Sequence, residues 1–491
     1  MTHRWRVLAV ILLALCTSSA GALAWRFRSA SPILHTLVFD APVREMAMDP
    51  GAQQVFIPFS DARGGGSLLM VSTDTGALRK TLPFSDVPSS LVVSSSTGRV
   101  FLMHSGPLGA QLAVIDSQSG VVLHNTPMDP VAEALAVEEA PGSHVVRHVY
   151  LASTDTYSYT NGAQCRSQPS RVQQLDAASG SPSRALFICG LVQDMAVDGR
   201  AGRLITHCGQ FLCLNDLQTG QSLRSLPLQQ WSDWGGMVVD ERTGRAFISV
   251  SLQPNGDSGS ILVLATQSGA LLRTVALPTA PGALALDAKR GRVYALTLGP
   301  ARLTTYTGIS NPTTPPGGTI SVSIAGLNPT GPGSLVAIDA RTGVLLRSTP
   351  VCVSPMGIAV DAATGRVFVT CSGPIHTQML PPGSSSYAHW SLIQGRVISL
   401  YDRGSLIVLD GATGHVLHTV AVGYDPIQVA LDPLRQRVLV LNAGGVPSGL
   451  RQDPWSWLPN WVRHRLPFFP PPAPPRLEPS SLTVLDDTRL R

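Results

Sequence analysis

From residue 31 onward, short apolar runs alternate with turns rich in Gly, Asp and Ser. In one clear stretch, PMGIAVDAATGRVFV at 355–369, two apolar runs flank the sequence Asp-x-x-Thr-Gly. The Asp of such a turn accepts a hydrogen bond from the backbone two residues on, and the Gly supplies the positive φ that closes a hairpin. The pattern therefore predicts antiparallel strands joined by tight turns.

The same pattern recurs along the chain. The stretch SLIVLDGATGHVLHTVAV at 405–422 supplies a second hairpin, and copies of both halves begin at Pro281 and Ser334 and again at Gly235 and Ser260. A period of about 40 to 50 residues is typical of repeat architectures built from one supersecondary unit. Each unit contains four strand-like runs, so the repeat predicts a four-stranded β unit.

Each unit carries two turns of this kind, which we call corners, and both counts reach eight. The first corners are assigned to Asp49, Ser95, Glu138, Asp198, Asp240, Asp287, Asp361 and Asp432. The second corners are assigned to Asp74, Asp116, Asp176, Asp216, Thr266, Asp339, Asp410 and Asp486. Because an acidic residue recurs in nearly every unit, we interpret it as a turn residue and not as a catalytic carboxylate.

The ends of the chain predict how the units are arranged. The last unit ends near Leu490 without a fourth strand, whereas ILHTLVFD at 33–40 precedes the first unit and resembles the missing strand. We predict an all-β fold: a single β-propeller over 31–491 with eight four-stranded blades, closed by pairing of the N-terminal strand into the last blade. Closure removes exposed sheet edges.

Three recurring motifs carry a family resemblance: P-x-x-[IVL]-A-[VL]-D, GRV[FY]V and [SL]-x-V-[IL]-D-x-x-[ST]-G. Together they resemble the repeats of YVTN-family β-propeller proteins, and the resemblance covers essentially all of 31–491. It implies a propeller. The family is most often described with seven blades, so seven is the alternative blade count.

Uneven spacing of the first corners locates insertions. Asp240 and Asp287 are 47 residues apart, but the next two intervals, ending at Asp361 and Asp432, are 74 and 71 residues. The excess falls between the second and third strands of a unit. The long insertions are 297–333, 372–404 and 442–480, with shorter ones at 104–111 and 153–170. In an antiparallel blade these loops lie opposite the corners, so all of them should decorate one face.

Loops on a rigid scaffold often carry binding residues, so we expect this face to be the functional surface; tolerated surface length is the alternative. Insertions at 154–162, 384–390 and 453–475 mix aromatic side chains with small polar or basic ones, as adaptable binding loops do. The candidate binding residues are Tyr157, Tyr159, Tyr387, His389, Trp390, Trp455, Trp457 and Trp461. For 453–475, a bilayer interface, a partner groove or a cap over the propeller's own face all remain open.

Two cysteine pairs occupy equivalent positions, nine residues before and ten residues after a first corner. They are Cys189 with Cys208 and Cys352 with Cys371. Each pair would join the start of a blade's first strand to the end of its second, a separation that a disulfide can bridge in an oxidising compartment. Cys165 and Cys213 are a third candidate pair, although connectivity does not follow from sequence. Buried free thiols are the alternative.

The first 30 residues differ from the rest of the chain. Basic residues, the apolar run VLAVILLALC at 7–16 and small residues at 17–24 follow the order of a secretory signal. The apolar stretch also extends over 7–25, about the 20 residues that a membrane-spanning helix needs. Residues 1–30 are therefore a cleaved signal peptide or an N-terminal membrane anchor, and either one predicts a secreted or extracytoplasmic protein.

Composition and motifs limit the function classes. The net charge of +5 comes from scattered Arg residues, so no nucleic-acid partner is expected. No local metal, cofactor or catalytic motif is present, although a propeller can assemble a site from separate blades. We expect a non-enzymatic binding or scaffold protein of the cell envelope, with a protein or glycan partner at the cell surface. A lactonase-like or quinoprotein-like propeller enzyme with its site in the central channel is the alternative.

Overall fold

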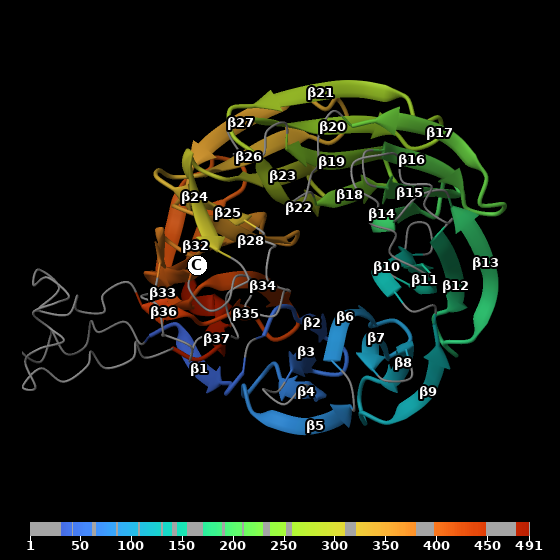
Figure 1. Ribbon diagram of the computed structural model, residues 1–491, viewed down its shortest axis with the longest axis horizontal. Coiled ribbons are helices and arrows are strands. Elements are labelled where there is room, and N and C mark those ends of the chain that lie inside the picture. The colour runs from blue at the N-terminus through green and yellow to red at the C-terminus, as the bar shows by residue number, and fades with distance from the viewer. Residues whose placement is uncertain are drawn as a thin grey trace, which may run out of the picture.

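The computed structural model describes residues 31–490 except 42, 61–64, 85–86, 107–108, 129–130, 140–144, 155–169, 189–191, 209–210, 229–235, 252–257, 310–320, 380–396 and 448–477. Eight four-stranded antiparallel sheets stand around a ring (Figure 1). The predicted eight-bladed propeller is thus confirmed.

The first four blades use consecutive strands. Blade 1 is β2 (Ala47–Asp49), β3 (Gln54–Ser60), β4 (Gly66–Ser72) and β5 (Leu78–Phe84); blade 2 is β6 (Val87–Ser94), β7 (Arg99–Gly106), β8 (Gly109–Asp116) and β9 (Val122–Pro127). Blade 3 is β10 (Val131–Glu139), β11 (Val146–Thr154), β12 (Ser170–Asp176) and β13 (Pro182–Ile188); blade 4 is β14 (Val192–Asp198), β15 (Arg203–Cys208), β16 (Phe211–Asp216) and β17 (Ser222–Pro227).

Blade 5 also uses consecutive strands, whereas blades 6, 7 and 8 are interrupted by further strands. Blade 5 is β18 (Met237–Asp240), β19 (Arg245–Ser251), β20 (Gly259–Ala265) and β21 (Leu271–Leu277); blade 6 is β22 (Pro281–Asp287), β23 (Arg292–Thr297), β26 (Ser334–Asp339) and β27 (Leu345–Pro350). Blade 7 is β28 (Pro355–Asp361), β29 (Arg366–Cys371), β32 (Arg403–Asp410) and β33 (Val416–Tyr424); blade 8 is β34 (Pro426–Asp432), β35 (Arg437–Asn442), β37 (Ser481–Asp486) and β1 (Ile33–Val38), followed by the 3-10 turn η2 (Asp487–Leu490).

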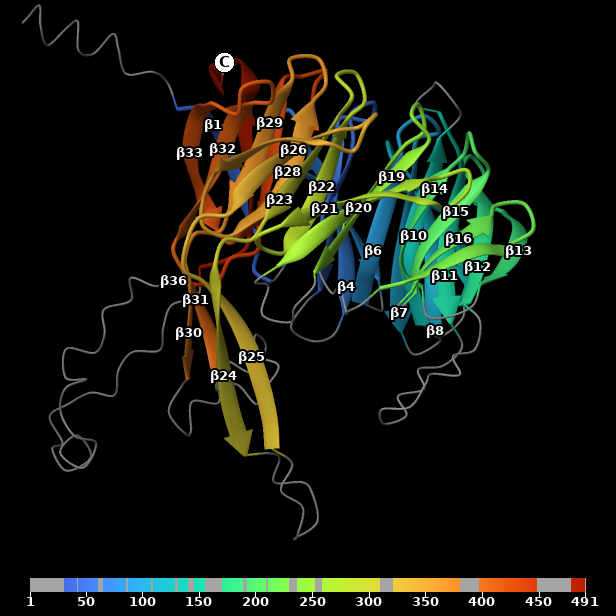
Figure 2. The same cartoon turned by 90° about the horizontal axis from the view of Figure 1, so that it is seen from above.

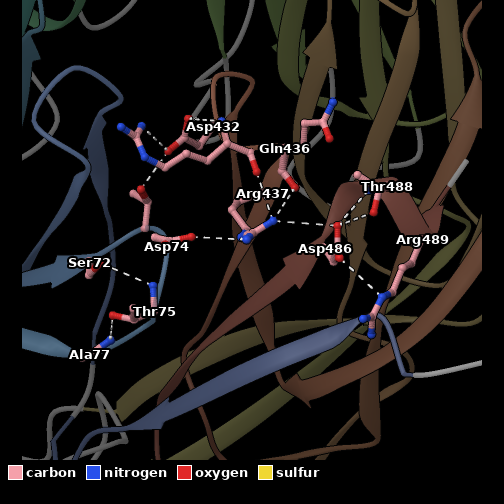
Figure 3. Close-up of polar contacts among 12 residues, drawn as sticks. Ser72, Asp74, Thr75, Ala77, Asp432, Gln436, Arg437, Asp486, Thr488 and Arg489 are labelled. Carbon is pink, nitrogen blue, oxygen red and sulfur yellow. Dashed lines mark hydrogen bonds and ion pairs between the residues drawn. The ribbon is translucent and has the colours of Figure 1, made fainter.

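The N-terminal strand closes the ring as predicted. β1 pairs antiparallel with β37, from Ile33 opposite Leu485 to Val38 opposite Ser481. At the seam, Arg437 Nη2 lies 3.2 Å from Asp74 Oδ1, which joins blade 8 to blade 1 (Figure 3). A buried bond from Thr73 Oγ1 to Asp432 Oδ2, 2.7 Å long, crosses the same junction. Chain termini that are far apart in sequence are therefore fixed in one blade.

The apolar side chains pack between blades. Eight clusters of buried side chains occur, and each joins two neighbouring blades. The cluster at the seam combines Leu439 and Leu482 of blade 8 with Val55 and Leu69 of blade 1. Because both faces of most strands are covered, apolar residues run nearly continuously through β3, β7 and β29.

The corners have the predicted turn chemistry. Asp410 Oδ1 accepts the backbone N–H of Thr413, and Gly414 follows at a φ of 76°. Three corner assignments are wrong by one or two residues: the strand-ending positions are Ser94, Ser72 and Ala265, not Ser95, Asp74 and Thr266. The assignments were shifted because Ser or Ala occupies the position that is usually Asp, and a polar residue one or two positions later resembles the Asp of the motif. The blade count is unaffected.

The two ends of the blades form two distinct faces. All corners lie at one end, the turn face, and the loops between second and third strands lie at the other, the insertion face (Figure 2). The expected short insertion at 104–111 is wrong, because β7 and β8 pair continuously from His104 opposite Gln111 to Gly106 opposite Gly109. These two strands are simply longer.

Candidate functional site: the insertion face

The insertions of blades 6, 7 and 8 contain strands of their own. β24 (Ala301–Ile309) and β25 (Ser321–Pro329) form a nine-pair antiparallel hairpin between β23 and β26. β30 (Ile375–Met379) and β31 (Val397–Tyr401) pair between β29 and β32. β36 (Val446–Pro447), which follows β35, adds to β31 in parallel. These strands project beyond the blades (Figure 2).

The three insertions are connected to one another. β31 and β36 belong to different blades yet share a sheet, with Leu400 opposite Val446 and Tyr401 opposite Pro447. β25 of blade 6 in turn contacts β30 of blade 7. The projection is therefore a joint structure of three blades, an arrangement that the spacing of the repeats did not reveal.

Glycine makes the blade 7 to blade 8 connection possible. Gly445 has a φ of 148°, and a Cβ there would lie 2.7 Å from Tyr401 Cδ2. Its backbone also exchanges two hydrogen bonds with Glu478, of 3.0 and 2.8 Å, at the other end of the insertion. Only a residue without a side chain fits between the Tyr401 ring and this ladder.

A disulfide joins the bases of two insertions. Cys352 and Cys371 are bonded, as the sequence predicts. The Cys352 carbonyl accepts the N–H of Gly333, where the β24–β25 insertion returns to its blade. Cys371 ends β29, where the next insertion begins. The bond therefore stiffens the platform from which the insertions of blades 6 and 7 leave.

Buried carboxyl groups mark the insertion-face end of the innermost strands. Burial raises the pKa of Glu45 to about 7 and that of Asp194 to about 6. Burial also raises the pKa of Asp425, whose Oδ1 accepts the Ser372 hydroxyl at 2.8 Å. Few hydrogen-bond donors reach these carboxyl groups, so desolvation of the charged form is the main cause of their raised pKa values.

Glu45 bridges two blades. It stands four residues before the corner Asp49, as Gln428 does before Asp432. Gln428 bonds both backbone groups of Met46 in the next blade, at 2.7 and 2.9 Å, and Glu45 likewise accepts a backbone bond from Leu91 in the next blade. Glu45 Oε1 is buried and has no hydrogen-bond partner among the described residues. At the junction of blades 1 and 2, the Glu45 carboxyl thus occupies the position that the Gln428 amide has at the junction of blades 8 and 1. The amide donates and accepts a hydrogen bond there, whereas one carboxyl oxygen of Glu45 has no partner among the described residues.

These carboxyl groups lie at different places on the ring. Glu45 and Asp425 precede the first strands of the adjacent blades 1 and 8, whereas Asp194 belongs to blade 4, opposite blade 8. Within the described residues, no group of three or more His, Cys, Asp or Glu side chains could hold a metal ion. The insertion face therefore offers projecting paired strands and separate, half-buried carboxyl groups.

The candidate aromatic residues cannot be placed. Tyr157, Tyr159, Tyr387, His389, Trp390, Trp455, Trp457 and Trp461 all lie outside the described residues. Their chain neighbours can be placed: β30 and β31 flank 380–396, and β36 precedes 448–477. Three of the predicted loops thus begin or end at the projecting strands or at blade 3.

The remaining cysteines are only partly described. Cys165 and Cys189 lie outside the described residues, so their pairings stay predictions. Cys208 and Cys213 are buried on neighbouring strands, and a hydrogen bond with Cys208 lowers the pKa of Cys213 to about 7. This proximity was missed because the two residues belong to different predicted pairs; their five-residue spacing across a hairpin was the available signal.

Comparisons with known proteins support the fold alone. No protein-family model and no curated protein matches the sequence. Among solved structures, Saccharomyces cerevisiae Sqt1 aligns with a TM-score of 0.53 and 13% identity, over 84% of this chain and 95% of that one. Dihydro-heme d1 dehydrogenase NirN, in complex with DHE, aligns with a TM-score of 0.51 and 14% identity, over 80% of this chain and 74% of that one.

The described residues also contain no helix that is long and apolar enough to cross a bilayer.

Proposed function

We propose that this chain is an exported, non-enzymatic β-propeller of the YVTN type that binds a protein or glycan at the cell envelope through its insertion face. The observation that carries the proposal is the joining of three insertions: β31 pairs with β36 from the next blade, and β25 contacts β30. A sheet shared between blades is not expected of insertions that are merely tolerated surface length.

The base of this surface is suited to recognition because it is held in place. The Cys352–Cys371 bond and the Ser372 to Asp425 hydrogen bond fix the points where insertions leave the ring. A preorganised surface loses less conformational entropy on binding. The segment that carries Tyr387, His389 and Trp390 follows β30, in the insertion that begins beside Cys371 and Ser372.

The sequence supports the location and the family. The basic, apolar and small-residue order of 1–24 favours export, and a disulfide is consistent with an oxidising compartment. The eightfold corner and strand motifs support assignment to the YVTN repeats. Residues 7–25 supply either a cleaved signal or a retained anchor.

A matched pair of glycine variants tests the binding face. In Gly445→Val the new side chain would collide with Tyr401 and release β36, whereas Gly282→Ala adds a methyl group with nothing within 4 Å. Both chains are applied to a glycan array and to envelope fractions from producing cells. We expect Gly445→Val to lose binding at least about tenfold and Gly282→Ala to keep it. Equal binding profiles for the two would sink the proposal.

One observation favours an enzyme instead. Glu45, with its pKa near 7, has the protonation behaviour of a general acid or base. Its contact with Leu91 gives it a structural role, and Asp194, another carboxyl with a raised pKa, lies in the distant blade 4. Absorbance of the purified chain for bound cofactor and a lactone hydrolysis assay of Glu45→Gln distinguish the two functions; turnover lost in the variant would establish the enzyme.

A further inference from the structure

Exposed apolar side chains gather on the opposite side of the molecule. Among the residues that the structure describes, 17 large apolar side chains are exposed, and 12 of them lie where an outermost strand begins, directly after a second corner. We call this set the apolar rim: Leu78, Val121, Val122, Leu123, Leu223, Leu271, Leu272, Val344, Leu345, Leu346, Val416 and Leu417. They are 39% to 51% exposed. They come from blades 1, 2, 4, 5, 6 and 7 and therefore follow the outer edge of the turn face.

The rim is held in place by ties between blades. Basic side chains just after the rim positions reach the second corner of the next blade. Lys80 Nζ bonds the carbonyls of Ser119 and Gly120 at 2.9 Å, and Arg347 Nη1 bonds the Ala412 carbonyl at 2.7 Å. The charges of Lys80 and Arg347 are thus bonded to backbone carbonyls, while the Leu and Val side chains of the rim face solvent. Contact with such a surface is therefore stabilised mainly by the burial of apolar area.

The N-terminal segment enters the propeller at the same edge. β1 is the outermost strand of blade 8, and its first residue, Ile33, lies at the turn-face end beside Leu485. Two bonds fix this entry: Asp486 N–H to the Pro32 carbonyl at 2.8 Å and Arg489 Nη1 to the Ser31 carbonyl at 2.8 Å. Figure 3 shows Arg489 beside Asp486 at this point.

The tether between the apolar run and the propeller is short. Only residues 26–32 separate the apolar stretch 7–25 from β1. Fully extended, these seven residues span at most roughly 25 Å. An anchor at 7–25 therefore keeps the turn face, and not the insertion face, close to the bilayer.

We propose that the apolar rim rests on the lipid bilayer in which residues 7–25 are anchored, so that the insertion face is turned away from the membrane. The inference rests on the anchor form of the proposed function. Because apolar contact and not charge drives it, the contact holds on zwitterionic lipid and at high salt. A mildly basic protein attracted only by charge would instead need anionic lipid.

Lipid photolabelling of the full chain tests the contact. The chain is reconstituted in phosphatidylcholine vesicles that contain a lipid with a photoreactive acyl chain, and labelled peptides are mapped by mass spectrometry. We expect labels on peptides with Leu272 and Leu346. A Leu272→Glu, Leu346→Glu variant should reduce rim labelling at least about fivefold, because charged groups resist entry into the interface. Phe187→Glu is the matched control: Phe187 is 66% exposed but lies at the insertion-face end of β13.

Each outcome has a distinct meaning. Unchanged melting temperatures show that the exposed substitutions leave the fold intact. Rim labels no stronger than those on β24 and β25 peptides, with the chain still retained by vesicles, overturn the rim contact and leave the anchor in place. A chain that is not retained by vesicles overturns both anchor and rim contact. Neither result depends on the partner-binding assays of the insertion face.

Discussion

Acidic side chains on the turn face have lowered pKa values, whereas acidic side chains on the insertion face have raised pKa values. On the turn face, backbone and hydroxyl donors of the tight turns lower the pKa of Asp176, Asp339 and Asp410. On the insertion face, burial raises the pKa of Glu45 and Asp194. The two faces differ in the number of N–H donors near each carboxylate. A corner places several donors around one carboxylate, whereas the start of an inner strand places one.

This contrast teaches which parts of the molecule the repeat determines. The second corners reverse the chain in the same way, so local N–H and hydroxyl donors reach carboxylates such as Asp176, Asp339 and Asp410. At the other face the repeat leaves the loops free to vary, and three of them have combined into one projection. The repeat thus determines the blades and their corners, and the joined insertions are the part of the molecule to which we assign the proposed function.

The largest effect is expected from the disulfide at the insertion face. Replacing Cys352 and Cys371 by Ala frees a loop whose ends are 19 residues apart. The expected loss of stability is about 3 kcal/mol, because the unfolded chain gains conformational freedom. Chemical denaturation measures it, and Gly282→Ala, which adds a methyl group with nothing within 4 Å, is the control away from the disulfide. A loss of less than about 0.5 kcal/mol would mean that this face is not held by the bond.

The second effect comes from Glu45 and depends on pH. Its folded pKa, about 7, lies above the ordinary 4.5, so the folded chain holds a proton that the unfolded chain releases. Stability therefore falls as pH rises from about 4.5 to about 7. Glu45→Gln removes this penalty and should stabilise the chain by about 2 kcal/mol at pH 8 and hardly at pH 4.

The equivalent residue of blade 8 supplies the reverse test for this prediction. Gln428→Glu would place a carboxyl between the same backbone groups of Met46. It should introduce a stability loss at pH 8 that is absent at pH 4. Melting curves across this pH range measure both variants, and a pH-independent result for either one would refute the role given to burial.

The smallest effect is expected at a corner and has the opposite sign with pH. Asp410 accepts the N–H and hydroxyl of Thr413, which lowers its pKa. Its contribution is present at neutral pH and is lost as pH falls below about 4 through the folded pKa. Asp410→Ala should cost about 1 kcal/mol at pH 7 and less as the pH falls below about 4. Ala265→Asp, which restores the missing corner carboxylate, should do the reverse in melting experiments.

The sequence allowed the ring to be predicted but not the joined insertions. Corner spacing, the N-terminal strand and the Cys352–Cys371 pair each depend on local chemistry that repeats, so the blades and their closure could be read directly. The β31–β36 pairing could not, because two short strands from different blades carry no shared period. The adjacent glycines Gly444 and Gly445, which adopt positive φ in the structure, were a local signal in the sequence.

Photo-crosslinking in producing cells tests most directly whether the two faces have separate partners. A photoreactive amino acid replaces exposed Arg302 at the base of β24 in one chain and Leu272 of the apolar rim in another. We expect a discrete protein or glycan adduct from position 302 and lipid adducts from position 272. A discrete adduct from position 272 with none from position 302 would contradict this expectation.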